Sequence, residues 1–170
     1  MYNIGELIIY GNEGVCRVEK IGASENPGAN KDRQYYTLIP LARNGKVIVP
    51  VDSSVFSRPV ISRAEAEEIV ASIPEVEAEV FNDRNLKLLT DHYKDAMKSC
   101  ACIDMVKTVK SIRLKRRQAI AAGKKLGTID ERFLKRAEDM LYGELSVALE
   151  KTKEEIKLII EQSFKLCEAE

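Results

Sequence analysis

The sequence has no tryptophan, only one histidine and no long apolar run, and each shortage argues against a class of function. His92 is the only imidazole available to a histidine-dependent hydrolase or a histidine-rich metal site. No segment approaches the roughly 20 apolar residues that span a bilayer, and the N-terminus lacks the basic and apolar regions of a secretion signal. We expect a cytoplasmic protein with no membrane contact, no metal and no cofactor.

The four cysteines show no spacing typical of a zinc site or a redox pair. Cys100 and Cys102 form a C-x-C pair, whereas Cys16 and Cys167 lie far from it in the sequence. Zinc-wrapping and thioredoxin-like sites need a C-x-x-C pair, and a chain of 170 residues can bury a sizeable core without cross-links. The cysteines are therefore predicted to be reduced thiols, most of them buried.

A net charge of zero hides a strongly basic central segment. Residues 84–125 hold 12 lysines and arginines against 3 acidic residues, whereas residues 1–83 hold 8 against 13 and residues 126–170 hold 7 against 11. Cations at a helix C-terminus complement the helix dipole, but a net charge of +9 exceeds that need. The excess is typical of a surface that neutralises the phosphates of a polyanion. An ordinary solvated face is the alternative.

The strand signals lie in the first sixty residues. Apolar runs at residues 7–10 and 15–21 flank a glycine-rich turn and predict one hairpin. Residues 35–51 contain two β-rich runs joined by Asn44-Gly45, a pair that favours a type I′ turn between adjacent strands. Four or five short strands in this stretch predict a small β-barrel.

From residue 62 onward the apolar spacing becomes helical. We predict helices at residues 63–72, 83–99, 104–121, 129–149 and 153–167, with Asp104 as a cap of the third. The sequence therefore predicts an α+β protein with its strands first and its helices second. Three pairs have the spacing of a capping box, in which a hydroxyl and a carboxylate satisfy free amides at a helix start: Ser62 with Glu65, Thr128 with Glu131, and Thr152 with Glu155.

The remaining candidates for chemistry are better explained by structure, and no phosphate-binding glycine loop is present. We therefore expect no enzyme. The carboxylates of one short helix and its connector are predicted to be a solvated face: Glu65, Glu67, Glu68, Glu75, Glu77 and Glu79. Apolar stripes on the last two helices are predicted to form the core of a bundle: Leu134, Ala137, Leu141, Leu145 and Ala148, then Ile156, Ile159, Ile160 and Phe164.

Two stretches of the sequence carry a resemblance to a known family. GELIIYGNEGVCRVEKI, followed by YYTLIPL and KVIVPVD, resembles the N-terminal module of the CarD family of bacterial transcription regulators, also called CdnL, and the related RNA polymerase interaction domain of the transcription-repair coupling factor. The stretch from YKDAMKS through IDMVKTVKSIRLKRR to DERFLKRAEDMLYGELSVAL is similar to the CarD helical domain. The resemblance implies a Tudor-like RNA polymerase-interaction domain over residues 1–60 and a helical DNA-contacting domain over residues 61–170.

The resemblance also implies a function. A CarD-like protein binds the lobe of the RNA polymerase β subunit and holds its helical domain against promoter DNA near the upstream fork, which stabilises the open complex without covalent chemistry. An exposed strand edge can accept a strand from the polymerase. The implied polymerase-binding residues lie on one strand and its neighbour: Tyr36, Thr37, Leu38, Lys46, Val47, Ile48, Val49, Pro50 and Val51.

On the DNA side the sequence departs from the family pattern. Many members carry a tryptophan that acts as a wedge at the fork, and Leu89 takes its place here. Leucine can act as an apolar wedge, but it lacks the stacking face of an indole. No base-reading motif is present, so we expect sequence-independent contacts with the DNA backbone. The implied DNA-binding residues are Arg84, Lys87, Leu89, Lys94, Arg113, Arg116, Arg117, Lys124 and Lys125.

One alternative stays open on the sequence alone. A protein-interaction module that does not bind DNA would use the same basic helices to dock on an acidic surface of RNA polymerase or of another partner. A flat response to added DNA would distinguish this module from the DNA-binding regulator. Because the helices show no long heptad seam, we expect a monomer in either case.

Overall fold

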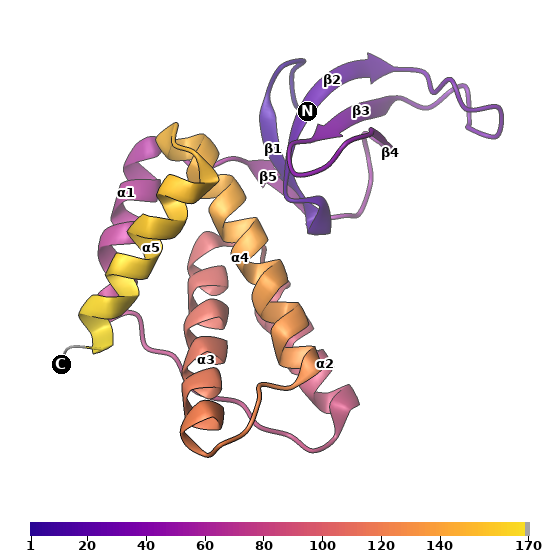
Figure 1. The fold of residues 1–170 in the computed structure, drawn as a ribbon. Coiled ribbons are helices and arrows are strands. Elements are labelled where there is room, and N and C mark those ends of the chain that lie inside the picture. Colours follow the sequence, from indigo (N-terminus) through magenta and orange to yellow (C-terminus); the bar gives the residue numbers. More distant parts are fainter. Residues whose placement is uncertain (169–170) are drawn as a thin grey trace. The chain divides into compact units, whose positions relative to one another are not determined.

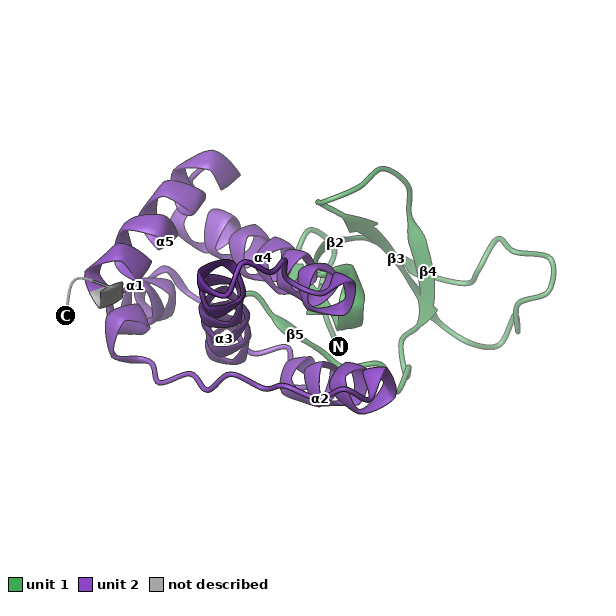
Figure 2. Ribbon diagram, turned by 60° about the horizontal axis from the view of Figure 1, so that its bottom comes forward, with its two compact units in different colours: residues 1–60 green, residues 61–170 purple. Residues whose placement is uncertain are grey.

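The computed structural model describes the backbone of residues 1–168 and the side chains of residues 1–166. The chain divides into two compact units, Met1–Val60 and Ile61–Glu170, which Figure 2 colours separately. Within the described residues, the first unit contains five strands and the second contains five α-helices (Figure 1). The α+β fold class is confirmed, and the units meet where the sequence pattern changes from strand-like to helical.

The first unit is an antiparallel sheet with the strand order β4-β3-β2-β1-β5. Alternate side chains of the strands form its core, as the pleat of a half-buried sheet requires. The core residues are Ile8, Tyr10, Cys16, Val18, Tyr36, Leu38 and Val49. The strands are β1 (Leu7–Tyr10), β2 (Val15–Gly22), β3 (Tyr35–Pro40), β4 (Val47–Pro50) and β5 (Ser57–Pro59), with a short 3-10 helix, η1 (Gly11–Glu13), between the first two.

The second hairpin forms as predicted, but its predicted type I′ turn does not. The ladder of β3 and β4 ends where Leu38 pairs with Val47, so a longer loop joins the strands. A type I′ turn needs positive φ at both central residues; Gly45 has φ 103°, whereas Asn44 is not among the residues with positive φ. Arg43 of this loop instead forms an ion pair with Glu13. The burial of alternate side chains sets the register, and the loop adapts to it.

The helices of the second unit lie close to their predicted positions. They are α1 (Arg63–Ser72), α2 (Leu86–Met97), α3 (Cys102–Ala121), α4 (Thr128–Leu149) and α5 (Lys153–Glu168), with a 3-10 helix, η2 (Ile73–Glu75), after α1. Both predicted apolar stripes lie in one core, with Ala148 and Ile159 at its margin. The predicted acidic face of α1 and its connector is exposed. Lys110 of α3 donates to the carbonyl oxygens of Ile73, Pro74 and Val76 and thereby caps η2.

One buried carboxylate holds the first residue of the second unit and one of its thiols. Glu144 is 3% exposed, and its carboxylate accepts hydrogen bonds from the amide of Ile61 at 3.1 Å and from the thiol of Cys102 at 2.9 Å. Cys16, Cys100 and Cys102 are buried, as predicted, and burial raises the pKa of Cys16 to about 11. The side chain of Cys167 lies outside the described residues.

Two of the three predicted capping boxes are present. The Ser62 hydroxyl accepts from the amide of Glu65, and the Glu65 carboxylate accepts from the amide of Ser62. Thr152 and Glu155 make the same reciprocal pair at 3.2 and 3.0 Å. These contacts satisfy amides that the first helical turn leaves without a partner, so they mark the starts of α1 and α5.

The predicted box at Thr128 and the predicted cap at Asp104 are wrong. Gly127 is the N-cap of α4, and Thr128 is already inside the helix. A Cβ at Gly127 would lie 3.0 Å from an oxygen of Asp130, so this carboxylate leaves little room for a side chain at the cap. Asp104 lies within the first turn of α3, where it accepts a hydrogen bond from the Ser99 hydroxyl.

A matched pair of variants tests these cap assignments. We expect Thr152→Ala to lower the free energy of unfolding by about 1 kcal/mol, because it removes a side-chain acceptor from a free helical amide. Thr128→Ala should change it by less than about 0.5 kcal/mol, because Thr128 makes no cap hydrogen bond. Urea unfolding of the two full-length variants measures both values. Equal losses would contradict the assignment.

Candidate functional site

The hydrogen-bond direction of β4 follows from one bond just beyond it. The amide of Val51 donates to the carbonyl of Gln34 on the β3 side at 3.0 Å. Backbone groups along an antiparallel strand point alternately to either side, so Val49 and Val47 also face β3. Ile48 and Pro50 therefore direct their backbone groups away from β3. Because β4 is at the end of the strand order, its side that faces away from β3 is a free edge of the sheet.

At the free edge of β4, one residue offers both a backbone donor and a backbone acceptor to an added strand. Pro50 has no amide hydrogen, and its carbonyl already accepts from the amide of Ser53 at 3.0 Å. Ile48 has both an amide hydrogen and a carbonyl turned outward. An added strand can therefore exchange a pair of backbone hydrogen bonds with Ile48, and Pro50 ends the pairing.

The opposite edge of the sheet, β5, is better protected. The amide of Val60 donates to the carbonyl of Leu7, and the amide of Gly11 donates to the carbonyl of Phe56. By the same alternation, the backbone groups of Ser57 and Pro59 point away from β1. Pro59 has no amide hydrogen, and the Arg58 guanidinium donates to its carbonyl at 3.1 Å. A proline with an engaged carbonyl blocks strand addition. With only three residues in β5, β4 is the more open edge.

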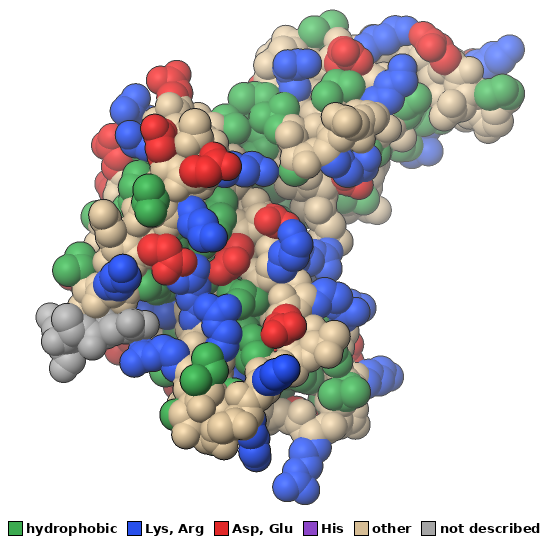
Figure 3. Space-filling view, viewed as in Figure 1, with side chains coloured by type: hydrophobic (Ala, Val, Ile, Leu, Met, Phe, Trp, Pro, Cys, Tyr) green, Lys and Arg blue, Asp and Glu red, His purple; other side chains and the backbone are tan. Residues whose placement is uncertain are grey.

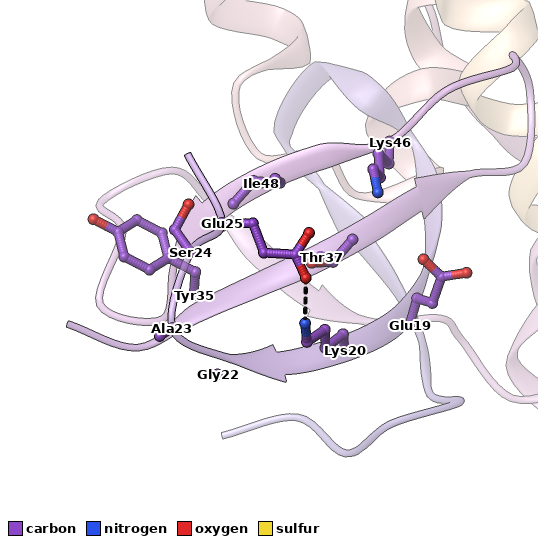
Figure 4. A pocket seen from close by; sticks show the side chains of 10 residues that line it. All are labelled: Glu19, Lys20, Gly22, Ala23, Ser24, Glu25, Tyr35, Thr37, Lys46 and Ile48. Carbon is purple, nitrogen blue, oxygen red and sulfur yellow. Dashed lines mark hydrogen bonds and ion pairs between the residues drawn. The ribbon is translucent and has the colours of Figure 1, made fainter. Parts of the chain in front are cut away.

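A shallow hollow lies on the sheet face beside Ile48. Figure 4 shows Tyr35, Thr37 and Ile48 on two neighbouring strands and the loop after β2 beside them. Lys20 and Glu25 form an ion pair at 2.7 Å across this face, and Lys46 lies at its rim. The remaining lining residues are Glu19, Gly22, Ala23 and Ser24. The hollow can receive a side chain that enters next to β4.

The structure divides the predicted polymerase-binding residues into two sets. Tyr36, Leu38 and Val49 are buried in the core of the sheet, so their side chains cannot contact a partner, and the prediction for these three is corrected. Val47 and Val51 are half-buried against the same core. The residues left at the edge or on the outer face are Thr37, Lys46, Ile48 and Pro50.

The basic segment forms one end of the helical unit. Short connections join α2 to α3 and α3 to α4, so the start of α2, the end of α3 and the start of α4 lie together. Figure 3 shows lysine and arginine side chains gathered over the lower part of this unit, where Figure 1 places the loop between α3 and α4. We call this surface the basic end. Its exposed cations are Arg84, Lys87, Arg116, Arg117, Lys124 and Lys125, whereas Lys94, also exposed, lies in the last turn of α2.

A buried network holds the three helices of the basic end together. Asp130 at the start of α4 is 3% exposed and accepts a hydrogen bond from the Tyr93 hydroxyl of α2. Lys115 of α3 donates to the same carboxylate at 2.9 Å. Burial lowers the pKa of His92, which stacks on Phe81 at 3.8 Å. The imidazole therefore adds no charge to the basic end at neutral pH.

Arg113 is not available to DNA, which corrects the prediction for this residue. Its side chain is 14% exposed and forms ion pairs with Glu138 at 2.9 Å and Glu161 at 2.7 Å. It also donates to the Tyr142 hydroxyl and lies 4.6 Å from the ring centre of Phe164. These contacts use the guanidinium to join α3, α4 and α5.

Leu89 is also misassigned as a wedge. It is 4% exposed and lies in the helical core, on the same face of α2 as Tyr93 and Met97. The neighbouring Leu86 and Leu88 are 63% and 51% exposed in the first turn of α2, beside the cations. A partner can therefore reach both apolar side chains.

One sequence signal that the prediction missed could have located one of the two exposed leucines. Leu89, Tyr93 and Met97 recur every four residues, the spacing of a buried helical stripe. This phase turns the side chain of Leu88 outward. Leu86 falls on the same face as the stripe, and it is exposed because it is the first residue of α2. Ile120, near the end of α3, is 65% exposed. The sequence does not predict this exposure, because the last turns of α3 carry no apolar stripe that would set their buried face.

The described residues contain no group of three or more histidine, cysteine or acidic side chains that could hold a metal ion. Within the same part of the chain, no helix has the length and apolarity needed to cross a membrane.

Comparison with known proteins bears on the strand unit alone. Residues 2–56 match the family model of the CarD-like/TRCF RID domain, which is a domain of the RNA polymerase-interacting type. The match covers β1 to β4, including the open edge, and ends before β5. Residues 57–170, with the basic end, lie outside it. No match was found among curated proteins.

Proposed function

We propose that the protein is a non-enzymatic transcription regulator of the cytoplasm that docks on the β subunit of RNA polymerase through β4 and contacts promoter DNA with the basic end. The observation that carries the proposal is the position of the open edge, because Ile48 lies within the matched CarD-like/TRCF RID domain. Backbone pairing with a polymerase strand would supply affinity there.

The DNA contact is argued from the helical unit. The basic end combines six exposed cations with the exposed side chains of Leu86 and Leu88, a combination suited to phosphates beside unstacked bases at the upstream fork. Holding this surface against melted DNA would stabilise the open complex more than the closed one, and only that difference shifts the equilibrium.

Capture of the purified β-lobe fragment of RNA polymerase by the full-length protein tests the docking. A fork-junction DNA added to the captured complex then tests the second contact. Retention of both partners is expected. Failure of the full-length protein to capture the β-lobe fragment would overturn the proposal. Retention of the lobe with no response to DNA would favour a protein-interaction module, whose basic end docks on an acidic protein surface instead.

Removing two cations of the basic end should weaken DNA binding at low salt. For Lys124→Gln with Lys125→Gln we expect roughly a five- to tenfold loss of DNA affinity. The slope of log affinity against log salt concentration should become shallower by about two, because two fewer phosphate contacts release counterions. Fluorescence anisotropy with a fork-junction duplex over a series of salt concentrations measures both.

The matched control removes two exposed lysines between α4 and α5 and at the start of α5. Lys151→Gln with Lys153→Gln makes the same change in net charge away from the basic end. If both double variants lose affinity equally, the DNA contact follows the overall charge of the protein and not the basic end.

A further inference from the structure

Ile120 near the end of α3 is exposed to a degree that the other isoleucines of the helical unit are not. Its side chain is 65% exposed, whereas every other isoleucine among the described residues of that unit, 61–166, is buried or half-buried. A large apolar side chain in water forgoes the free energy that burial would provide. Single exposed apolar residues are common on protein surfaces, so the exposure is informative only together with its surroundings.

The end of α3 holds Ile120 in a regular structure. The amide of Gly123 donates to the carbonyl of Ile120 at 3.0 Å, and the amide of Lys124 donates to the carbonyl of Ala119 at 2.8 Å. Gly123 has φ 70°, and this pair of bonds around a left-handed glycine is a Schellman motif, which satisfies the last carbonyls of a helix. Leu126, two residues after the motif, is buried in the helical core. A fixed helix end therefore presents the isoleucine.

The chain around Ile120 is positively charged. Residues 105–129 contain eight lysines and arginines and no acidic residue. Arg116 and Arg117 lie one helical turn before Ile120, on the same side of α3, and Lys124 follows one turn after it; all three cations are exposed. Cations bind phosphates, and apolar side chains pack against unstacked bases. An apolar group between cations therefore fits a strand that alternates phosphates with bases.

We propose that Ile120 contacts an unpaired base of the DNA bound at the basic end, as a second apolar contact separate from that of Leu86 and Leu88. The proposal rests on the DNA contact proposed above and adds a residue that selects melted DNA over paired DNA. In a duplex the face of a base is covered by its stacked neighbours, whereas melting exposes it to a side chain. Ile120 should therefore strengthen binding to a fork and add little to the binding of an intact duplex.

The absence of tryptophan from the chain allows a direct test. Ile120→Trp introduces the protein's only indole, whose fluorescence reports on its own surroundings. Leu158→Trp is the matched control, because Leu158 is also 65% exposed but lies on α5, outside the basic end. Each full-length variant is titrated with a fork-junction DNA and with an intact duplex, and the anisotropy of the labelled DNA gives its affinity.

We expect the fork to quench the fluorescence of Ile120→Trp more strongly than the duplex does, and neither DNA to affect Leu158→Trp. The affinity of Ile120→Trp for the fork should rise roughly three- to tenfold, because bases stack well on an aromatic ring. Ile120→Ala removes the contact without disturbing the core, and it should weaken binding to the fork roughly two- to threefold and leave duplex binding unchanged. Leu158→Ala should change neither affinity.

Equal quenching of the two tryptophan variants by the fork, or an unchanged fork preference in Ile120→Ala, would overturn the proposal. A fluorescence change of Ile120→Trp on addition of the polymerase β-lobe fragment without DNA would do the same, because it would identify a protein surface as the occupant. If the fork binds the unmodified protein and Ile120→Trp does not respond, the DNA contact stands and the role of Ile120 is wrong. If the fork does not bind at all, the DNA contact itself fails.

Discussion

Ile48→Pro should abolish most of the binding to the polymerase β lobe while the protein stays folded. The proline removes the one outward amide at the centre of the free edge and leaves the facing carbonyl of the partner strand unpaired. We expect an affinity loss of about thirtyfold or more, because an unsatisfied buried acceptor costs roughly 2 kcal/mol and the ring also opposes close approach. Surface plasmon resonance with immobilised lobe measures it.

The fold should tolerate this change, since the Ile48 amide makes no bond to β3 and prolines occur at edge strands. Ile48→Val is the matched control: it shortens the side chain, keeps the amide and should retain binding within about threefold. Unfolding in urea identifies any loss of structure. Full binding by Ile48→Pro would contradict docking at this edge.

Leu89→Ala should destabilise the helical unit, and Leu88→Ala should not. Leu89 is buried among the side chains of the helical core, so its truncation leaves a cavity and lowers the free energy of unfolding by about 2–4 kcal/mol. Leu88 is half exposed in the same helix, and its truncation should cost less than about 0.5 kcal/mol. Urea unfolding of the full-length variants measures the difference.

For DNA binding we expect the opposite: the exposed leucines should matter and the buried Leu89 should not. Leu86→Ala with Leu88→Ala should reduce the preference for a fork junction over an intact duplex by roughly threefold, because exposed apolar side chains stack against unpaired bases. Leu89→Ala, measured at a temperature where it is folded, should keep the preference. A loss of fork preference in the folded Leu89→Ala variant alone would restore Leu89 as the wedge.

Local signals in the sequence predicted most of the secondary structure. The capping boxes at Ser62 and Thr152 start α1 and α5, and the helices lie within a few residues of their predicted positions. Such signals work because a cap or an apolar stripe involves residues within a few positions of each other. The predicted box at Thr128 is absent because α4 begins one residue earlier than the box requires, with Gly127 as its N-cap, and Asp130 of the first turn bonds to Tyr93 and Lys115 on other helices.

The candidate sites depended on contacts between distant residues. Arg113 belongs to the basic segment of the sequence, yet its charge is used by Glu138 and Glu161, which lie on other helices. The resemblance placed Leu89 at the DNA surface, and the packing of α2 against the core buries it. Counting charges along the chain cannot separate a cation that joins helices from one that faces solvent.

By itself, the sequence determined the order of strands and helices and the location of the basic segment. These follow from period, composition and turn chemistry, which are properties of short stretches. The tertiary structure decided which edge is open, which residue on it is available and which cations are exposed. Each of these depends on contacts that form only in the folded chain. Ser53 and Arg58 engage the carbonyls of Pro50 and Pro59, and Glu161 on another helix engages Arg113.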